Sequence, residues 1–515
     1  EMRDYAAGTS SRSGKLIHGG LRYLEQLDFP LVREALRERA LMLNRLCPHL
    51  VKPVPFIYPL THRGWERAYV GAGLVLYDTL GGAGAVPRHR HLTRRGALKA
   101  APALGASGLT GAITFYDAQV DDARHTMTLA RTAAAHGAVL ASSAQVTGFL
   151  RGGDTISGVR VRDLESGADF DLRGRHVISA AGAWTGEVQD MAGARGGFRV
   201  RASKGVHLLV PRERIRSGAA ILVRAEDSVL FIRPWGSHWL IGTTDTPWDR
   251  DLSHPVADRD DVDYLLRNVN RIIDPPLATV DVEGVFAGLR PLVSGKPGST
   301  SRLSREHAVA SPVPGLTVIA GGKYTTYRVM ARDAVDAAAG GLGQPVPPSC
   351  TRDIPLLGAA GYRALWNSRH RLTRQSGLTE GQVGHLLGRY GSAARDLLAL
   401  VAHSPELAEP IPGAEDHLKA EACYAVTHEG ALHLEDILAR RLHASSETHD
   451  GGIRAAGHVA PLAGRALGWD ERTAAAEIDR YRRWLEAERR WRGHPGGGTD
   501  AAGRPVHDSR PATAT

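Results

Sequence analysis

The residues best suited to chemistry are a few lysines that stand beside glycines. The chain has 515 residues with 64 lysines and arginines together, yet only seven of these are lysine. Lys15, Lys204 and Lys323 each follow or precede a glycine. A lysine ammonium is compact and its pKa shifts readily, which a guanidinium cannot imitate. These positions are therefore candidates for binding a ligand's charge or for handling a proton.

The segment TSSRSGKLIHGGLRYL (9–24) gathers hydroxyls, small residues and cations in one stretch. Hydroxyls and exposed backbone N–H groups bind phosphate oxygens, and small residues let a large ligand approach the backbone. Lys15, His18, Arg22 and Tyr23 add donors to the same stretch. The segment is typical of a ligand-binding loop, although a solvated Gly/Ser loop has the same composition.

Two predicted strands end in small residues, where a cofactor can come close to the backbone. HVISAAGAW (176–184) is expected to be a buried strand ending at SAAGAW. In VIAGGKYTTYRVMA (318–331), a strand runs into a Gly-Gly pair and a helix begins at Thr325, so Lys323 would project toward free N–H groups. A helix N-terminus favours a phosphate or an electron-rich ring edge. Each segment is also compatible with an ordinary strand end.

Two further motifs place a histidine and an arginine on strand-like patterns. In SKGVHLLVP (203–211), His207 opens a strand and can face a cleft, with a structural hydrogen-bonding histidine as the alternative. In FAGLRPLV (286–293), Arg290 is suited to bind a phosphate with two parallel N–H donors, and Arg305 can join it. Surface ion pairing is the alternative for both arginines.

Composition excludes several classes of protein. Hydrophobic residues are 43% and charged residues 23%, which is ordinary for a soluble globular protein, and no apolar run reaches 18 residues. Three widely separated cysteines match no zinc spacing, so neither a metal site nor a disulfide framework is expected. The formal charge of +9 reflects either attraction to an anionic substrate or membrane face, or scattered arginines. No aromatic–basic pattern indicates nucleic acid.

The elements that must position these residues fall into three regions. Within residues 1–350, predicted helices and single strands alternate with a block of antiparallel strands: helices 29–46, 64–80, 122–137 and 258–273, strand 316–320, and the strand block 205–211, 219–224, 228–234 and 238–243. This mixture predicts a nucleotide-binding α/β domain interrupted by a substrate-binding sheet. A Gly/Pro linker at 340–348 precedes a nearly all-helical region that ends near residue 492.

The motifs occur in an order that resembles one family of enzymes. They are TSSRSGKLIHGGLRYL, YDAQVDDAR (116–124), SAAGAW, SKGVHLLVP, IGTTDTPW (241–248), GLRPLV, SREHAV and AGGKYTTYR, followed by the helical YAVTHEGALHLEDILARR (424–441). Together they resemble the FAD-dependent glycerol-3-phosphate dehydrogenases, within the wider group of D-amino-acid-oxidase-like flavoenzymes. The resemblance covers residues 1 to about 480.

The resemblance implies a mixed α/β and α+β fold in three parts. A Rossmann-like FAD-binding domain (about 1–60, 115–190 and 305–345) is interleaved with a substrate-binding domain that contains an antiparallel sheet (about 61–114 and 191–304). An all-helical C-terminal domain (351–492) follows, and residues 493–515 are expected to form a disordered tail.

The start of the chain departs from the family pattern. Gly14 stands where the family usually has a second serine, and no G-x-G-x-x-G fingerprint is present. Glu1 matches the family's ribose-binding glutamate, which in a dinucleotide fold follows the fingerprint by roughly 20 residues. We therefore expect the sequence to be truncated, with roughly 30 residues of βαβ unit upstream. A genuinely shortened chain that has lost its flavin is the alternative.

The resemblance also implies the reaction and the residues of its site. The family oxidises sn-glycerol 3-phosphate to dihydroxyacetone phosphate, with hydride transfer to N5 of FAD. His207 is the expected general base, Lys323 stabilises reduced flavin or binds substrate, and Arg290 holds the phosphate. Substrate contacts are expected from Arg22, Tyr23, Arg290, Arg305 and Thr325. FAD contacts are expected from Glu1, Thr9, Ser10, Ser11, Ser13, Lys15, His18, Gly19, Val146, Ala181, Gly182, Trp184, Gly321, Gly322, Lys323 and Thr325.

The electrons must then leave the flavin, and the family uses a membrane quinone or, in some members, oxygen. Residues 64–80 carry Trp65, Tyr69 and Tyr77 around an apolar middle, flanked by Arg63 and Arg67, which favours a helix in a membrane interface or, alternatively, a core helix. We expect a cytoplasmic protein that can work at the inner face of the plasma membrane, and a homodimer is compatible with this. A peroxide-forming glycerol-3-phosphate oxidase and a flavin-free, non-catalytic remnant are the competing hypotheses.

Overall fold

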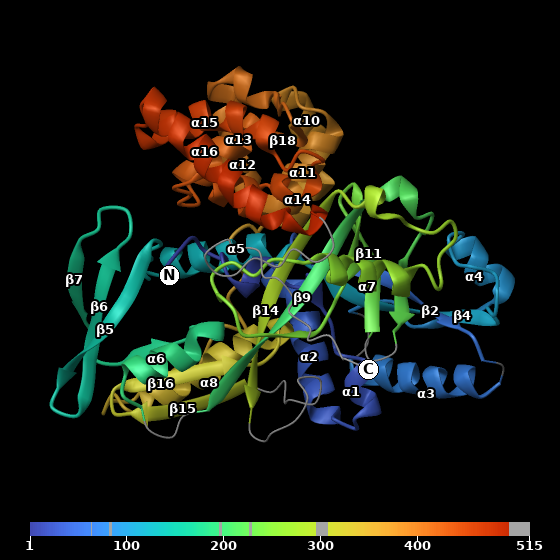
Figure 1. The fold of residues 1–515 in the computed structure, drawn as a ribbon, viewed down its shortest axis with the longest axis horizontal. Coiled ribbons are helices and arrows are strands. Elements are labelled where there is room, and N and C mark those ends of the chain that lie inside the picture. Colours follow the sequence, from blue (N-terminus) through green and yellow to red (C-terminus); the bar gives the residue numbers. More distant parts are fainter. Residues whose placement is uncertain (63, 82–84, 195–197, 226–228, 295–306, 494–515) are drawn as a thin grey trace, which may run out of the picture.

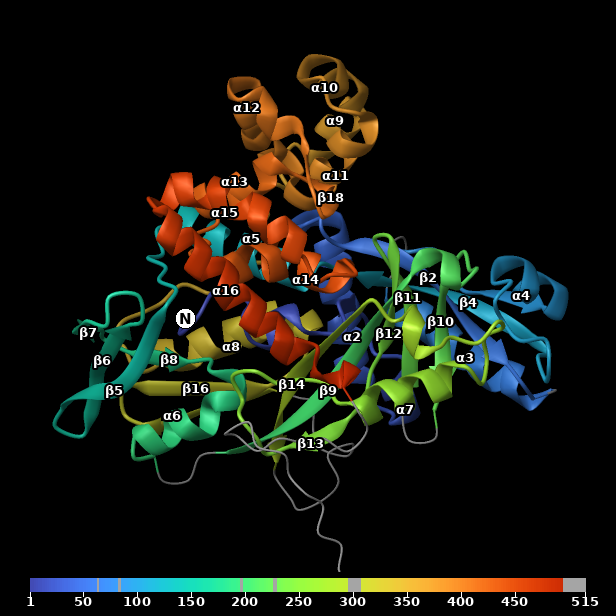
Figure 2. The same cartoon turned by 45° about the horizontal axis from the view of Figure 1, so that its top comes forward.

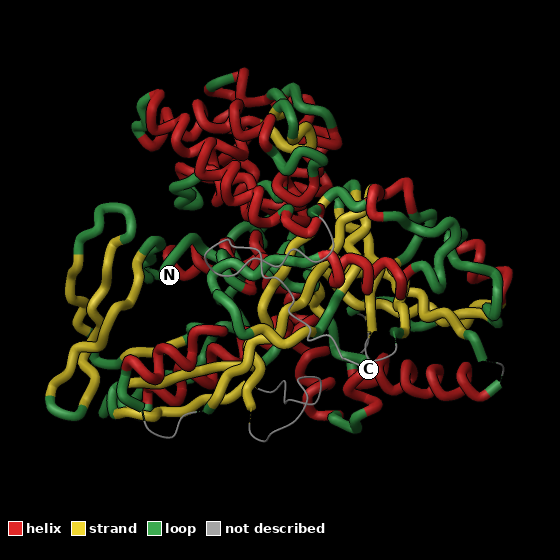
Figure 3. Tube along the Cα trace, in the orientation of Figure 1, coloured by secondary structure: helices red, strands yellow, loops and turns green. Residues whose placement is uncertain are grey.

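The computed structural model describes residues 1–62, 64–81, 85–194, 198–225, 229–294 and 307–493, without the side chains of Arg22, Glu25 and Ser294. A helical domain lies above a mixed α/β body, and the N-terminus lies close to where the two meet (Figures 1 and 2). Helices make up most of the upper domain, whereas the lower body contains both strands and helices (Figure 3).

The central feature of the described chain is a ten-stranded sheet. Its order is β1-β4-β2-β10-β11-β12-β9-β13, and β3 pairs with β4 and β14 with β9. Neighbours are mostly antiparallel, whereas β2 and β10 run parallel. The strands are β1 (Leu16–Ile17), β2 (Lys52–Leu60), β3 (Arg90–Thr93), β4 (Gly111–Gln119), β9 (Arg199–Pro211), β10 (Ala220–Arg224), β11 (Val229–Trp235), β12 (His238–Gly242), β13 (Thr246–Trp248) and β14 (Gly284–Ser294).

The two faces of this sheet have different surroundings. Successive side chains of a strand point to opposite faces. Val206 and Leu208 of β9 lie in a hydrophobic core with Val262 and Leu265, which belong to helix α7 (Arg259–Val269). His207, between them, therefore points to the other face, which is the face available for a site.

Two smaller sheets of the described chain extend the body to one side (Figure 1). One has the order β15-β16-β8 and the other β5-β6-β7. Their strands are β5 (Ala144–Gly152), β6 (Thr155–Asp163), β7 (Asp169–Arg173), β8 (Val177–Ser179), β15 (His307–Val313) and β16 (Leu316–Gly321). Because β8 and β16 are parallel, their carboxyl ends meet at one edge.

The expected buried strand at 176–184 is wrong in length and burial. Strand β8 spans three residues, Val177–Ser179, and a short 3₁₀ helix, η3 (Gly182–Trp184), follows it. Ile178 is exposed, because in the described residues β8 pairs with β16 along a single edge. The apolar residues of this segment correctly indicated a strand, but they did not show that it would be short and paired along one edge.

The predicted helices of the body are present, together with three short ones that the sequence did not predict, α1, α4 and α6. The helices of the body are α1 (Arg22–Glu25), α2 (Phe29–Leu41), α3 (Trp65–Leu80), α4 (Arg94–Ala100), α5 (Asp122–Ala135), α6 (Thr185–Met191), α7 (Arg259–Val269) and α8 (Tyr327–Ala339). Side-chain caps fix several starts, since Asp121 accepts the N–H of Arg124 and Asp258 forms a capping box with Asp261. The predicted helix at 29–46 ends its regular turns at Leu41 and continues as a π-helical turn, Met42–Leu46.

The C-terminal domain has its own hydrophobic core. It consists of α9 (Tyr362–Asn367), α10 (Arg369–Ser376), α11 (Glu380–Tyr390), α12 (Ala394–His403), α13 (Lys419–Thr427), α14 (Ala444–Glu447), α15 (Ile453–Leu467) and α16 (Glu471–Glu488), with the π-helical turn η10 (Asp436–Arg441). A small hairpin of β17 (Pro410–Ile411) and β18 (Ala414–Leu418) interrupts the helices. The expected tail at 493–515 falls, from residue 494 on, outside the described residues.

Candidate active site

The loop from Gly8 to Tyr23 is held in place by one buried carboxylate of helix α5. Asp122 accepts the N–H and the hydroxyl of Ser13, at 3.0 and 2.6 Å, and pairs with the ammonium of Lys15. Lys15 itself adopts a left-handed backbone conformation, with φ of 50°. The polar groups of Ser13 and Lys15 are therefore used to shape the loop, and Asp122 is a residue that the sequence motifs did not single out.

His207 lies on the open face of the sheet, enclosed by Phe286 and Gly242. Its ring stacks on Phe286 at 5.1 Å between centroids, and the register pairs His207 with both neighbours. A Cβ on Gly242 would come within 2.3 Å of the imidazole, so the glycine makes room for it. The buried Nδ1 has no hydrogen-bond partner among the described residues. Burial, then Arg233, Arg290 and Lys15, hold the pKa of His207 well below its usual value.

Arg290 stands on the same face, one strand away, with its guanidinium already oriented. It donates to the Thr243 hydroxyl at 2.9 Å and to the Asp245 carboxylate at 3.3 Å, and its side chain remains 25% exposed. A Cβ on Gly205 would lie 2.4 Å from the guanidinium, so this glycine keeps the arginine's place free. Thr243 and Asp245, in the segment IGTTDTPW, thus support Arg290 from the end of β12, on the other side of β9.

Tyr23 and Lys323 meet on the other side of the loop. The Lys323 ammonium lies over the Tyr23 ring, 3.4 Å from its centroid, and close to Gly20, whose φ is 78°. Thr325 is buried and joins the same loop to the helix start, because its hydroxyl accepts from the N–H of His18 at 3.1 Å and donates to the carbonyl of His18 at 3.2 Å. These two hydrogen bonds therefore hold the loop against the start of the helix.

Glycines with positive φ lie where the parallel strands β8 and β16 end. Gly182 has φ of 58°, and Gly321 and Gly322 have 76° and 80°. Trp184, after the first of these turns, lies 3.9 Å from where a Cβ on Gly8 would stand. Ala181 precedes the same turn. These ends bring glycine backbone and helix N-termini together beside the loop, a donor set that fits a flat dinucleotide cofactor.

The first residues of the chain lie along the start of β5. The N–H of Ala144 donates to the carbonyl of Glu1 at 2.9 Å, and the N–H of Ser143 to the carbonyl of Arg3 at 3.1 Å. Val146 follows on β5 and is partly exposed. Glu1 and Val146 are therefore brought to the same part of the molecule.

The other predicted residues occupy structural positions or fall outside the description. The Thr9 hydroxyl donates to the carbonyl of Leu289 at 2.6 Å, and Ser10 and Ser11 lie in the short helix η1 (Thr9–Ser11). The N–H of Gly19 donates to Tyr77 Oη at 2.8 Å. The Arg22 side chain and all of Arg305 lie outside the described residues.

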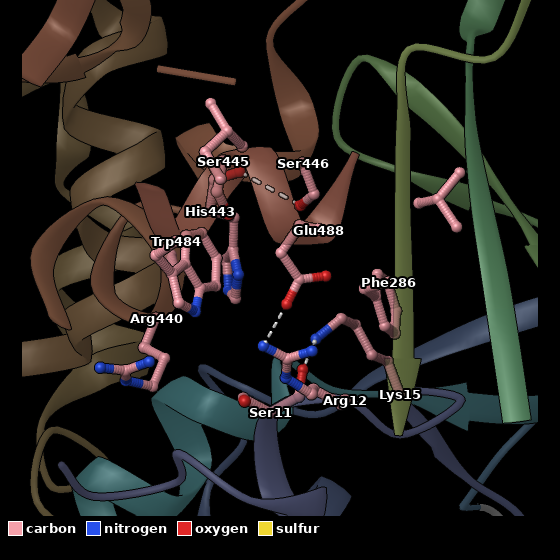
Figure 4. A pocket seen from close by; sticks show the side chains of 13 residues that line it. Ser11, Arg12, Lys15, Phe286, Arg440, His443, Ser445, Ser446, Trp484 and Glu488 are labelled. Carbon is pink, nitrogen blue, oxygen red and sulfur yellow. Dashed lines mark hydrogen bonds and ion pairs between the residues drawn. The ribbon is translucent and has the colours of Figure 1, made fainter. Parts of the chain in front are cut away.

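A pocket beside the site separates the loop from the C-terminal domain. Ser11, Arg12 and Lys15 face His443, Trp484 and Glu488 across it, and Phe286 forms its inner wall (Figure 4). Arg12 pairs with Glu488 at 2.6 Å, and the deeper Arg440 pairs with Asp4 at 2.5 Å. The cations of this pocket thus face carboxylates of the protein, and Phe286, which stacks on His207, separates the pocket from that histidine.

Two family models match the chain. The model described as FAD dependent oxidoreductase matches residues 1–328, and that described as C-terminal domain of alpha-glycerophosphate oxidase matches residues 349–474. A glycerol-3-phosphate dehydrogenase of Mycobacterium leprae is 56% identical over 488 residues, which are 95% of this chain and 83% of the relative. The human mitochondrial glycerol-3-phosphate dehydrogenase is 33% identical, over 95% of this chain and 69% of its own length.

Solved structures are also similar. A glycerol-3-phosphate dehydrogenase of Bacillus halodurans, complexed with FAD, matches with a TM-score of 0.78 and 26% identity, over 95% of this chain and 89% of that one. An L-alpha-glycerophosphate oxidase of Mycoplasma pneumoniae with bound FAD matches with a TM-score of 0.53 and 16% identity, over 69% and 91% respectively, a likeness of fold alone.

Proposed function

The chain belongs to the FAD-dependent oxidoreductase family and, within it, to the glycerol-3-phosphate dehydrogenases, and from that premise we propose how its residues act. The reaction is the FAD-dependent oxidation of sn-glycerol 3-phosphate to dihydroxyacetone phosphate. The observation that carries the proposal is the pairing of β9 with β14, which sets His207 and Arg290 on one open face of the sheet.

Arg290 holds the phosphate of the substrate in this proposal. Its guanidinium is oriented by Thr243 and Asp245 and stays partly exposed, and a phosphate accepts two parallel N–H bonds from such a fork. Tyr23 and Thr325 contribute from the loop and the helix start. Arg22 and Arg305 are further proposed contacts, which lie outside the described side chains.

His207 accepts the proton of the C2 hydroxyl. A general base must be unprotonated before the reaction, and the lowered pKa of His207 keeps its imidazole neutral at physiological pH. When bound, FAD supplies the acceptor for the hydride that leaves C2. Lys323 brings a positive charge next to Tyr23, where it favours negative charge on a bound ligand.

Residues at the strand ends and the loop would hold FAD. We assign the ribose to Glu1, the adenine side to Val146, and the remainder to three groups of residues: the loop residues Thr9, Ser10, Ser11, Ser13, Lys15, His18 and Gly19; the β8 end Ala181, Gly182 and Trp184; and the β16 end Gly321, Gly322, Lys323 and Thr325. Ser13, Lys15 and Thr325 would act through their backbone or by fixing the loop, since their side chains are engaged in the protein.

A reductive titration tests the reaction and its phosphate requirement. Glycerol 3-phosphate, added without oxygen to the FAD-reconstituted full chain, should bleach the yellow flavin absorption, whereas glycerol at the same concentration should not. An unchanged spectrum with glycerol 3-phosphate would overturn the proposal. Equal bleaching by glycerol would contradict the phosphate-binding role of Arg290 but not the oxidation reaction itself.

We propose a quinone as the electron acceptor, reached at a membrane surface. Within the described chain, no helix is both long and apolar enough to cross a bilayer. Helix α3 instead exposes Trp65, Tyr69, Val75 and Leu76 while Leu74 and neighbouring residues pack inward. An amphipathic helix of this kind can lie in a membrane interface. Tyr77, counted with the interfacial aromatics by sequence, is instead buried and donates to Asp117 at 2.7 Å.

Arginines near α3 support the same surface. Exposed Arg33 and Arg37 of α2, with Arg352, line a groove that also contains Phe29 and Leu80, the last of these in α3. Guanidinium groups attract anionic lipid headgroups. Flotation with anionic vesicles should carry the protein upward, and the variant with Trp65→Ser and Tyr69→Ser should stay in solution. A wild-type protein that remains in solution would remove the membrane from the proposal.

The acceptor is tested separately from the membrane. Under air, with glycerol 3-phosphate and a soluble quinone analogue, quinone should be reduced with little hydrogen peroxide. Peroxide formed in step with substrate oxidation, unaffected by the quinone, would identify the oxidase instead.

A further inference from the structure

We propose that the C-terminal domain binds a divalent metal ion of the kind that imidazole ligands favour, such as Zn²⁺, through His385, His417 and Glu421. The three residues come from three elements: α11, β18 and α13 (Figure 2). Among the described residues, their ligand atoms lie within 4.8 Å of one another. None of the three residues is among those proposed for the reaction, and all three belong to elements of the C-terminal domain, so the proposal does not rest on that function.

The distances suit a tetrahedral ion. His385 Nε2 lies 3.0 Å from Glu421 Oε1 and 3.1 Å from Oε2, and His417 Nδ1 lies 3.5 Å from Oε2. Zinc bonds of about 2.0–2.1 Å at a tetrahedral angle separate neighbouring ligand atoms by roughly 3.3 Å. The metal would thus fit between these atoms with side-chain adjustments of a few tenths of an ångström.

The carboxylate is already oriented for this role by its second oxygen. Tyr390 Oη donates to Glu421 Oε1 at 3.0 Å, and Arg389 lies 3.6 Å from that oxygen. Oε2, on the metal side, accepts the N–H of Leu418 at 2.9 Å. Groups that hold a ligand from behind are the usual second layer of a metal site. Arg389 opposes a nearby cation, and we place it against Oε1, away from the proposed ion.

His417 provides an observation independent of the cluster's spacing. It is buried, and its Nδ1 has no hydrogen-bond partner among the described residues although it is directed toward Glu421. A buried polar atom without a partner costs free energy unless something binds it. His385, whose side chain is 25% exposed, gives the ion a path from solvent. The pattern assigns two imidazoles and one carboxylate to the ion and leaves a fourth position for water.

This ligand set selects the kind of metal. Imidazole nitrogens suit zinc, copper and nickel, whereas calcium and magnesium require mostly oxygen ligands. Two nitrogens and one carboxylate oxygen correspond to a three-ligand zinc site. An ion there would tie α11, the hairpin strand β18 and α13 together, so its expected effect is to stabilise the helical domain.

Co²⁺ substitution tests the site directly, because tetrahedral Co²⁺ gives intense visible absorption. The full chain, treated with chelator and then given one equivalent of Co²⁺, should develop these bands, and Zn²⁺ should abolish them. His417→Gln and His385→Gln should each weaken Zn²⁺ binding by about 100-fold, measured by competition with a chromophoric chelator. The matched control is His403→Gln, at the exposed end of α12, which should bind as the wild type does.

The outcomes distinguish this site from binding elsewhere on the chain. Zn²⁺ should also raise the melting temperature of wild type and control but not of the two site variants. Absence of the Co²⁺ bands would overturn the proposal, and so would bands that persist in His417→Gln. If His385→Gln fails to fold because it disturbs Glu421, His417→Gln alone decides, since the contact of His417 Nδ1 with Glu421, at 3.5 Å, is the longer of the two.

Discussion

The guanidinium of Arg290 donates to Thr243 and Asp245. These two contacts fix its orientation, so the charge of Arg290 and its orientation can be tested by different substitutions. The sequence predicted Arg290, His207, Tyr23 and Lys323 because each stands in a short motif that resembles one of the family's. It did not predict their supports, since Thr243 and Asp245 become neighbours of Arg290 only through strand pairing. Roles at the residue scale remain predictions, and three substitutions test them.

Substitution of Arg290 should affect substrate binding more than turnover. Arg290→Ala removes a charged contact to the phosphate and should raise KM for glycerol 3-phosphate by about 10-fold or more. Arg290→Lys keeps the charge but loses the two-pronged geometry, so it should recover only part of the loss. Steady-state kinetics measure both. An unchanged KM in Arg290→Ala would remove the phosphate role.

His207→Gln should lower kcat while FAD stays bound, because a neutral amide cannot accept the proton. In the wild type, the folded pKa lies well below the unfolded value of about 6.5. As pH falls, the imidazole of residue 207 is therefore protonated in the unfolded chain before it is protonated in the folded one. Neutral His207 thus lowers the free energy of unfolding below about pH 6.5 but not above it. When denaturation is measured from pH 8 to 5, the free energy of unfolding should fall less steeply in His207→Gln than in the wild type. Wild-type kcat across this range would exclude His207 as base.

Arg233 is a buried cation that the sequence did not single out. Its guanidinium is 2% exposed, and its terminal nitrogens have no hydrogen-bond partner among the described residues. Burial lowers its pKa to about 9, with Asp122 acting in the opposite direction. Arg233→Met should therefore raise the free energy of unfolding by about 1–3 kcal/mol. Arg454→Met, in an exposed pair, should change it by less than about 1 kcal/mol. A lower free energy of unfolding in Arg233→Met would contradict this expectation, because it would show that the guanidinium of Arg233 makes stabilising contacts in the folded protein.

At the scale of elements, helices were predicted more accurately than the sheet edges. Helix α3 and helix α5 carry apolar residues at helical spacing over several turns, so their ranges were confirmed within two residues. The strand block at 205–243 was also confirmed, with β9 extending further toward the N-terminus. Strand β8 was mispredicted because three residues are too few for a period to be read.

Glycines at the sheet face should behave differently from helix glycines. In Gly205→Ala the new Cβ would meet the Arg290 guanidinium at 2.4 Å and Thr243 Oγ1 at 2.7 Å, so KM for glycerol 3-phosphate should rise as it does when Arg290 is displaced. Gly73→Ala, in α3 with nothing within 4 Å of the new Cβ, should leave KM unchanged and stabilise the helix by up to about 1 kcal/mol. Equal KM values in the two variants would contradict this account.

At the scale of the whole molecule, buried charges join the first residues to the C-terminal domain. Asp4 accepts from Arg441 at 2.7 and 2.8 Å and from Arg440 at 2.5 Å, and all three are buried. Arg124 of α5 likewise pairs with Glu429. The sequence predicted two regions joined by a linker but not this contact, because residues more than 400 positions apart leave no periodic signal.

Asp4→Asn should loosen this junction. Burial raises the pKa of Asp4, but Arg441 and Arg440 outweigh it and hold the pKa below its usual value. A carboxyl of lowered pKa contributes stability above its unfolded pKa of about 3.9 and loses it as pH falls further. Removing the charge should cost about 3–5 kcal/mol at pH 7 and flatten the loss of stability in acid. Hydrogen exchange at residues 5–15 should quicken. Unchanged stability would mean that the arginines find other partners.

The Asp4–Arg440–Arg441 contact also constrains how parts of related enzymes can be exchanged. A hybrid that takes its helical domain from a relative would keep this contact only if that domain places arginines at positions 440 and 441. Without them, Asp4 is a buried carboxylate that loses its arginine donors. Residues 4, 440 and 441 must therefore be chosen together in such a hybrid, although the chain separates them by most of its length.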